Sequence, residues 1–252
     1  MNRRKVLAGA MSVPVLAEAA SAQAPKSASP VRVKSPSTSG NASLKVEGTR
    51  VFVETHTLSA VIDKGCITSL KSRFSGEEFI KNPDTGRIAS LQLLYPSNET
   101  IGIDEKKFGE IRARQLSSHR AEIVYHSWDG DGVLGIEIDP ENGDMVIEPS
   151  AYSSRPGVRA CRWNIAALNP DLRLVAPLFQ GISMDMNDPL LRNTRWEWPM
   201  YWEAGLVILQ SKDGGFWIHT RDDRYHCKAL QIGDKNDPFV VGLDSEAYGP
   251  ID

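Results

Sequence analysis

From Leu44 onward the chain alternates hydrophobic and polar residues in short segments, and turns rich in glycine and aspartate separate these segments. The clearest case is a hairpin. Residues 51–55 and 58–62 alternate, Asp63-Lys64-Gly65 forms a turn, and residues 66–70 return. Alternation with a period of two is typical of β-strands that bury one face. The sequence therefore predicts an antiparallel hairpin at the start of a folded region over residues 44–252.

The same pattern predicts strands along the rest of the chain. Their expected ranges are 90–95, 110–116, 121–127, 133–139, 145–149, 158–166, 172–176, 205–210, 216–220, 228–232 and 239–243. Between them no stretch of about ten residues has a persuasive apolar period of 3.6, so no helix is predicted. Many short strands at even spacing indicate two packed antiparallel sheets or a barrel. The absence of a longer repeat disfavours a propeller or solenoid. We expect an all-β fold, an antiparallel sandwich.

The N-terminal segment has a different composition. A twin arginine, Arg3-Arg4, precedes an apolar stretch over residues 6–20 and small-residue cleavage sites. This order is typical of an export signal, and the paired arginines favour the bacterial twin-arginine route. A proline and a glutamate interrupt the apolar stretch, which is shorter than the roughly 20 residues that span a bilayer. We expect residues 1–22 to be a signal peptide and the mature protein to be periplasmic or secreted.

The signal is followed by a Pro/Ser-rich segment, residues 23–43, whose large hydrophobic residues before Leu44 are Val31 and Val33. Such a segment buries too little apolar surface to offset ordering, so it predicts a flexible linker. The whole chain has net charge −3, and removal of a signal with net charge +2 leaves about −5. No basic run survives processing. This charge pattern argues against nucleic acid and anionic membrane as partners.

Cysteines and acidic turns give no signal for a bound ion. Cys66, Cys161 and Cys227 lie in apolar strand-like runs without a C-x-x-C pair, so a zinc cluster is not expected. They are interpreted as small buried hydrophobic residues, although one disulfide of undetermined pairing stays open for an exported protein. The acidic turns at residues 129–132 and 139–144 lack the spacing of a calcium loop. Neither a metal nor another cofactor is predicted.

The densest unusual segment spans residues 195–203. Its four large aromatic side chains are Trp196, Trp198, Tyr201 and Trp202, and its carboxylates are Glu197 and Glu203. Aromatic faces suit the C–H faces of sugar rings, while carboxylates bind hydroxyl groups. A core or domain-packing role explains the aromatics as well. Pro199 favours a loop or an edge strand. The two glutamates are the one pair worth testing for glycosidase chemistry, on spacing alone.

A second polar cluster follows the double glycine at residues 214–215. After the return strand it holds Arg221, Asp222, Asp223 and Arg224, and His219 and His226 lie on either side. Solvated ion pairs at a strand end explain this run, and a polar ligand rim is the competing interpretation. The two histidines lack a third ligand at matching spacing, which disfavours a metal site.

Two groups of motifs carry a family resemblance. The opening hairpin through Leu70, together with residues 74–79, resembles the start of a galactose-mutarotase-like supersandwich. Residues 198–202 and 214–223 are similar to segments near the end of this sandwich in bacterial glycoside-hydrolase-like proteins, such as endo-α-N-acetylgalactosaminidase-like enzymes. The resemblance covers roughly Leu44 to the end. It implies that a catalytic (β/α)₈ barrel follows the sandwich, so we expect a truncation at Asp252.

The resemblance leaves no catalytic residue to assign, because the barrel carboxylates have no counterpart in this chain. We expect an exported, non-catalytic sandwich domain that supports carbohydrate binding or packs against its own C-terminal barrel. The candidate carbohydrate-binding residues are Trp196, Trp198, Tyr201, Trp202, Arg221, Asp222 and Asp223. One alternative is a stand-alone sugar epimerase or polysaccharide lyase, whose catalytic histidine cannot be matched to His119 or His126. Another is a structural domain-packing module.

Overall fold

The computed structural model describes residues 6–9, 42–81, 88–97, 99–103, 110–128, 130–222, 225–234, 237 and 239–251. Within these residues the chain is all-β, and its one helix is the 3₁₀ turn η1 (Pro189–Leu191). Every strand pairing is antiparallel. The predicted fold class, all-β with antiparallel sheets, is therefore confirmed.

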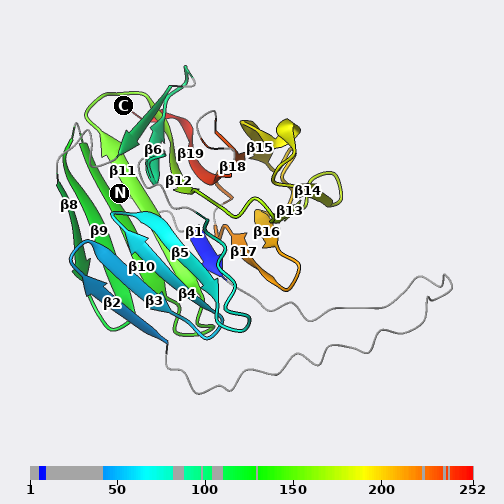
Figure 1. Ribbon diagram of the computed structural model, residues 1–252. Coiled ribbons are helices and arrows are strands. Elements are labelled where there is room, and N and C mark those ends of the chain that lie inside the picture. The colour runs from blue at the N-terminus through cyan, green and yellow to red at the C-terminus, as the bar shows by residue number, and fades with distance from the viewer. Residues whose placement is uncertain are drawn as a thin grey trace, which may run out of the picture.

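The strands form three sheets (Figure 1). The nine-stranded sheet has the order β14 (Ile182–Asp185), β13 (Arg173–Ala176), β16 (Leu206–Gln210), β17 (Gly215–His219), β1 (Val6–Gly9), β11 (Met145–Ser153), β10 (Gly130–Ile138), β9 (Arg120–Trp128) and β8 (Glu110–Gln115). The six-stranded sheet has the order β15 (Thr194–Trp198), β18 (Lys228–Ile232), β19 (Val241–Ile251), β12 (Val158–Ile165), β6 (Leu91–Leu94) and β7 (Thr100–Ile103). The four-stranded sheet is β2 (Ser43–Glu47), β3 (Arg50–Glu54), β4 (Leu58–Asp63) and β5 (Cys66–Ser72).

The predicted opening hairpin is confirmed as strands β4 and β5. Their two-residue turn has Lys64 at φ 52° and Gly65 at φ 89°. Positive φ at both turn positions is the geometry that matches the twist of the two strands. Along β4 the side chains of Leu58, Ala60 and Ile62 are buried and alternate with partly exposed ones, as a strand with one core face requires.

One hydrophobic core joins the inner faces of the sheets. The core face of β10 lies close to the six-stranded sheet, because a Cβ added at Gly132 would lie 3.4 Å from Leu91 and 3.5 Å from Ile103. Tyr125 on β9 reaches the start of β6, where its hydroxyl lies 3.0 Å from Ser90 Oγ. In Figure 1 the four-stranded sheet, blue to cyan, lies across the green strands β8–β11, in agreement with its contacts to β8, β9 and β10.

Several strands are absent from the prediction, and their patterns explain why. Strand β14 has no buried residue, and β7 is short and contains Gly102, so neither shows a clear alternation. Strand β15 was not predicted, because its aromatic composition obscures the alternation that marks a strand. It is an edge strand that ends before Pro199, which agrees with the predicted loop or edge position. Strand β10 already begins at Gly130, so residues 130–132 of the expected turn belong to this strand, and residue 129 lies outside the described residues.

The expected signal and linker lie mostly outside the described residues, which leave out 1–5 and 10–41. Strand β1, Val6–Gly9, is the described part of the signal segment and occupies a position between β11 and β17. Among the described residues, no helix has both the length and the apolar character to cross a membrane. All three cysteines are described, half-buried and without a disulfide.

Candidate functional site

Strand β15 places its residues alternately on two faces of the six-stranded sheet. Trp196 lies opposite Leu230 and Trp198 opposite Lys228, whereas Glu197 lies opposite Ala229 on the other face. Trp196 and Trp198 are half-buried and pack against the core. The alternation therefore separates the aromatic from the ionic residues of this segment.

The other two predicted aromatic residues differ sharply in exposure. Trp202 is fully buried, and its Nε1 donates a hydrogen bond of 2.8 Å to the carbonyl of Leu206. Its assignment to a sugar-contacting surface is corrected, because a side chain without exposed surface cannot meet a ligand in this state. Tyr201 is exposed and packs edge-on against Phe179, with ring centroids 6.1 Å apart.

Trp198 is the centre of a cluster at the start of β18, which we call the Trp198 cluster: Trp198, Asp222, Tyr225, His226 and Lys228. The rings of Trp198 and Tyr225 stack at 21° with centroids 6.2 Å apart. Lys228 Nζ lies 4.3 Å from the centroid of the Trp198 ring. Trp198 Nε1 donates to the carbonyl of Glu203 at 3.2 Å, which fixes the ring plane.

Asp222 organises the polar half of this cluster. Its carboxylate accepts hydrogen bonds from the His226 backbone N–H at 2.5 Å and from Lys228 Nζ at 3.1 Å, and it lies 2.9 Å from His226 Nδ1. Lys228 is buried, so its ammonium depends on the Asp222 carboxylate and the Trp198 face for compensation. Asp222, one of the polar residues predicted for the site, therefore lies in the same cluster as the predicted Trp198.

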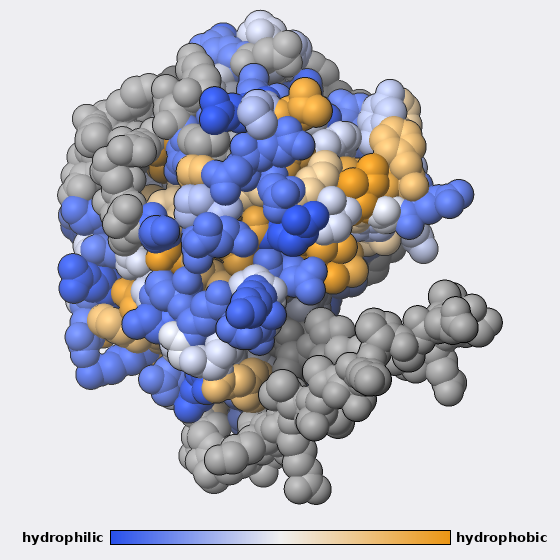
Figure 2. All heavy atoms as spheres, turned by 45° about the vertical axis from the view of Figure 1, so that its right-hand side comes forward, coloured by the Kyte–Doolittle hydropathy of each residue, from blue (hydrophilic) through white to orange (hydrophobic). Residues whose placement is uncertain are grey.

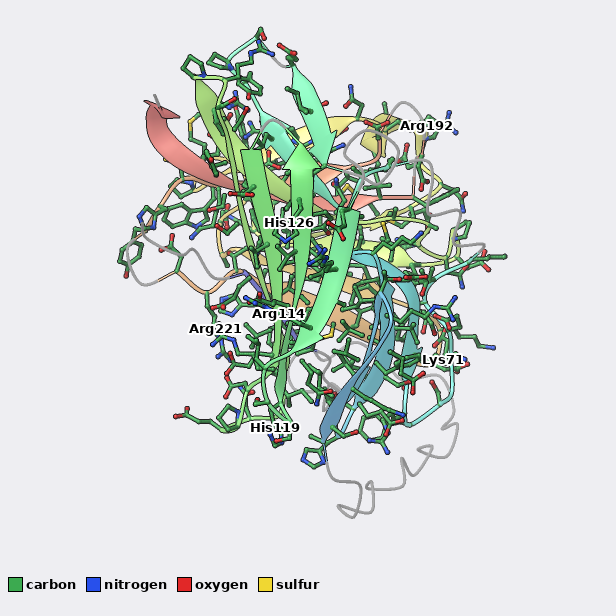
Figure 3. The ribbon with its side chains drawn as sticks, turned by 90° about the vertical axis from the view of Figure 1, so that its left-hand side faces the viewer. Lys71, Arg114, His119, His126, Arg192 and Arg221 are labelled. Atoms are coloured by element: carbon green, nitrogen blue, oxygen red, sulfur yellow. The ribbon has the colours of Figure 1, made fainter. Side chains whose placement is uncertain are left out.

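Arg221 makes a separate contact. It reaches Asp139 at 2.9 Å and Asp144 at 3.4 Å, in the turn between β10 and β11. Backbone hydrogen bonding and the Arg221 guanidinium lower the pKa of Asp139, whereas burial raises the pKa of Asp144. Figure 3 shows Arg221 beside the strands of the nine-stranded sheet. Arg221 thus forms ion pairs, which is one of the two interpretations of residues 221–224. Asp223, like Arg224, lies outside the described residues.

The histidine on β17 gives a pH-dependent prediction. Burial, with smaller effects of Arg221 and Lys228, lowers the pKa of His219. The unfolded chain then takes up this proton first, so stability is lost as pH falls through the unfolded value of about 6.5. We expect the wild-type protein to lose more free energy of unfolding between about pH 8 and about pH 5 than His219→Gln does. Urea unfolding across this range checks it, and parallel pH profiles for the two proteins would contradict it.

The opposite face of β15 carries an ionic network that the sequence analysis missed. The Asp244 carboxylate, fully buried, pairs with Arg162 and with Arg195, whose Nε lies 2.9 Å away. Arg195 also pairs with Glu246 and with Glu197, the latter at 2.5 Å. The sequence signal for this network consists of charged residues at alternate positions. They are residues 195 and 197 on β15, residues 244 and 246 on β19, and Arg162 on β12. The meaning of this signal depends on the strand register, which the sequence does not give.

A histidine and a carboxylate meet in the Trp198 cluster at His226, for which the sequence suggests only the role of a metal ligand. The contact of Asp222 with His226 Nδ1 orients the imidazole, an arrangement that can serve a general base. His119 lies in the β8–β9 turn, 2.8 Å from Ser118 Oγ, and His126 lies on β9 (Figure 3). In the described part of the chain, no three His, Cys, Asp or Glu side chains form a group that could hold a metal ion.

Comparison with known proteins assigns the chain to no family, because no protein-family model matches the chain and no curated protein matches its sequence.

Proposed function

We propose that this chain is an exported domain of a glycoside-hydrolase-like protein, built as a galactose-mutarotase-like supersandwich, and that the Trp198 cluster contributes to carbohydrate binding. The observation that carries the proposal is the stacked pair of Trp198 and Tyr225, because Tyr225 is 72% exposed at the surface. An exposed aromatic ring above a second ring offers a firm apolar surface to the C–H face of a sugar.

The polar residues of the cluster support the same proposal. Asp222, Lys228 and His226 lie beside the two rings and can pair with hydroxyl groups along the edge of a sugar. Their mutual contacts hold them in place before a ligand arrives, which reduces the entropy cost of binding. Tyr201 and Phe179 form a second exposed aromatic pair, for which we propose a further sugar contact.

Removal of the exposed ring should weaken sugar binding without harming the fold. We expect Tyr225→Ala to lower affinity for the best oligosaccharide on the order of 10-fold, because aromatic anchors dominate such contacts. Titration calorimetry with a panel of oligosaccharides measures the change. Tyr152→Ala is the matched control, since Tyr152 is also exposed but lies on β11 of the nine-stranded sheet. Absence of binding to the whole panel, or an equal loss in the control, would count against the proposal.

A domain-packing role is the second candidate, favoured by exposed apolar side chains. The segment over residues 179–201 exposes five large apolar or aromatic residues between 37% and 83%: Phe179, Ile182, Leu190, Met200 and Tyr201. Figure 2 shows apolar residues among polar ones on the side of the molecule that carries β13–β16. A C-terminal barrel is the partner we propose for this surface. Dye binding and self-association of the isolated chain, reduced by Met200→Lys, support packing rather than sugar contact.

The third candidate is a self-contained epimerase or lyase, which the His226–Asp222 contact favours. Such an enzyme needs His226 as a proton acceptor next to a bound sugar. Turnover of a sugar by the purified chain, abolished by His226→Gln, would establish it. Binding without turnover favours the non-catalytic domain.

A further inference from the structure

The two most exposed aromatic side chains in the described part of the chain, Tyr225 at 72% and Phe179 at 64%, share an unusual backbone conformation. Phe179 has φ 48° and Tyr225 has φ 54°, both in the left-handed region. Bulky residues rarely adopt this region, because their Cβ lies too close to the following carbonyl oxygen. Glycine and asparagine adopt it more readily. Each position therefore holds an aromatic residue where a smaller residue would relieve backbone strain.

Burial does not explain why these two positions are aromatic. A ring that is mostly exposed removes little apolar surface from water, so it adds little to the stability of the fold. The other exposed aromatic residues, Phe74, Tyr152 and Tyr201, lie outside the left-handed region. Strained residues of this kind concentrate at binding sites, where the surrounding structure holds them in place. The combination of strain and exposure at residues 179 and 225 therefore points to a ligand.

Hydrogen bonds next to each residue hold the strained backbone. Beside Phe179, the Gly181 N–H donates to the Leu178 carbonyl at 3.0 Å, and Leu178 forms a β-bridge with the buried Trp202. Beside Tyr225, the next residue in the chain donates its backbone N–H to the Asp222 carboxylate at 2.5 Å. The two rings are thus presented to solvent from fixed points of the backbone.

One turn connects the partner rings of the two residues. Phe179 packs edge-on against Tyr201 with ring centroids 6.1 Å apart, and Tyr225 stacks on Trp198 with centroids 6.2 Å apart. Trp198 and Tyr201 belong to the same turn, in which the Glu197 carbonyl accepts the Tyr201 N–H at 2.9 Å. Residues three apart in such a turn have Cα atoms within about 7 Å of each other. The two aromatic pairs therefore lie on either side of this turn.

Two aromatic pairs offer stacking surfaces to two sugar units, since one sugar ring covers one aromatic ring. We propose that Phe179 and Tyr225 bind separate units of one neutral oligosaccharide chain, and that Phe179 determines a preference for longer chains. This inference rests on the carbohydrate binding proposed for the Trp198 cluster. The chain is neutral because Asp222 and Lys228 pair with each other at 3.1 Å, so their charges compensate each other.

The length of the glycan tests the two contacts separately. NMR titration of the protein uses cello-, malto-, chito- and galacto-oligosaccharides of increasing length, starting from the single sugar. In the series that binds, we expect affinity to rise on the order of 10-fold from the shortest to the longest member. Phe179→Asn should abolish this rise and leave the shortest member unaffected, because the polar residues of the Trp198 cluster favour the Tyr225 end. Tyr225→Asn should weaken binding at every length.

Unfolding separates a ligand contact from a packing role. Because asparagine suits a positive φ, Phe179→Asn should unfold at a urea concentration at least as high as that of the wild type, although it loses the preference for long chains. Phe74→Asn is the matched control, since Phe74 is an exposed phenylalanine outside the left-handed region. This control should keep the preference for long chains.

The outcomes distinguish this inference from the proposed function. Equal affinity for short and long chains, or an equal loss at every length in Phe179→Asn, overturns the inference and leaves sugar binding at the Trp198 cluster standing. A lower unfolding midpoint in Phe179→Asn with unchanged binding also overturns it. Tighter binding of oligogalacturonates than of galacto-oligosaccharides overturns the neutral class of ligand. Absence of binding to all four series overturns the inference together with the proposed function.

Discussion

Asp244→Asn should lower the free energy of unfolding by about 3–5 kcal/mol, because it removes one partner from a buried ionic network. Asp244 is fully buried on β19 and compensates the charges of Arg162, on the neighbouring strand β12, and of Arg195 on β15, which lies on the far side of β18. Arg162 is also buried and has the Gln231 side chain as a further, longer contact at 3.5 Å. The variant keeps the shape of the side chain but takes the Asp244 carboxylate from Arg162, and it leaves Arg195 with Glu197 and Glu246 alone. Urea unfolding at neutral pH measures the loss.

The control for this prediction is Asp185→Asn. Asp185 on β14 pairs with Arg173 on β13 at 2.6 Å, also across two antiparallel strands, but both side chains are largely exposed. Exposed pairs contribute about 0–1 kcal/mol, so this variant should unfold almost like the wild type. Similar losses in the two variants would show that burial of the Asp244 network has no energetic role.

Gly65→Ala should lower the free energy of unfolding by about 3–5 kcal/mol, through backbone strain and steric overlap together. Gly65 has φ 89°, a region that L residues with a side chain adopt at a cost of about 1–2 kcal/mol. A Cβ at this position would overlap the Tyr125 hydroxyl and lie 2.7 Å from Ser90 Oγ. The hairpin turn would have to move away from the core. Thermal and urea unfolding measure the effect.

Two variants separate the strain from the overlap. Gly48→Ala has the same kind of backbone, at φ 61°, with nothing within 4 Å of the added Cβ, so it should lose only about 1–2 kcal/mol. Tyr125→Phe removes the hydroxyl that the new methyl group would meet, and combined with Gly65→Ala it should restore part of the lost stability. A loss of equal size at Gly48 and Gly65, or no restoration in the double variant, would refute the steric explanation.

The local part of the fold could be predicted from the sequence because its signals are local. Alternation at Leu58, Ala60 and Ile62 and the Lys64-Gly65 turn lie within a few residues of one another, and they define the opening hairpin. The same holds for the double glycine turn before β17. Strand β14 could not be predicted, because its residues are all exposed or half-exposed and its apolar and polar side chains show no clear alternation.

The candidate site was only partly predictable because its contacts join distant segments. Trp198 and Asp222 were both named from composition, but their meeting at Lys228 depends on the pairing of β15 with β18. Tyr225 and the pairing role of His226 were missed for the same reason. Trp202 has the same residue type as Trp198, and only the chain path after Pro199 determines that one is half-buried and the other lies in the core.

The two-sided composition of β15 limits how this segment can vary in length. Insertion or deletion of a single residue within the strand would rotate the remaining side chains to the opposite face of the sheet. Trp198 would then face the ionic network, and Glu197 would face the core side that Trp196 fills. Gaps in an alignment of related chains should therefore fall outside β15, where extra residues lengthen a surface turn without inverting a strand.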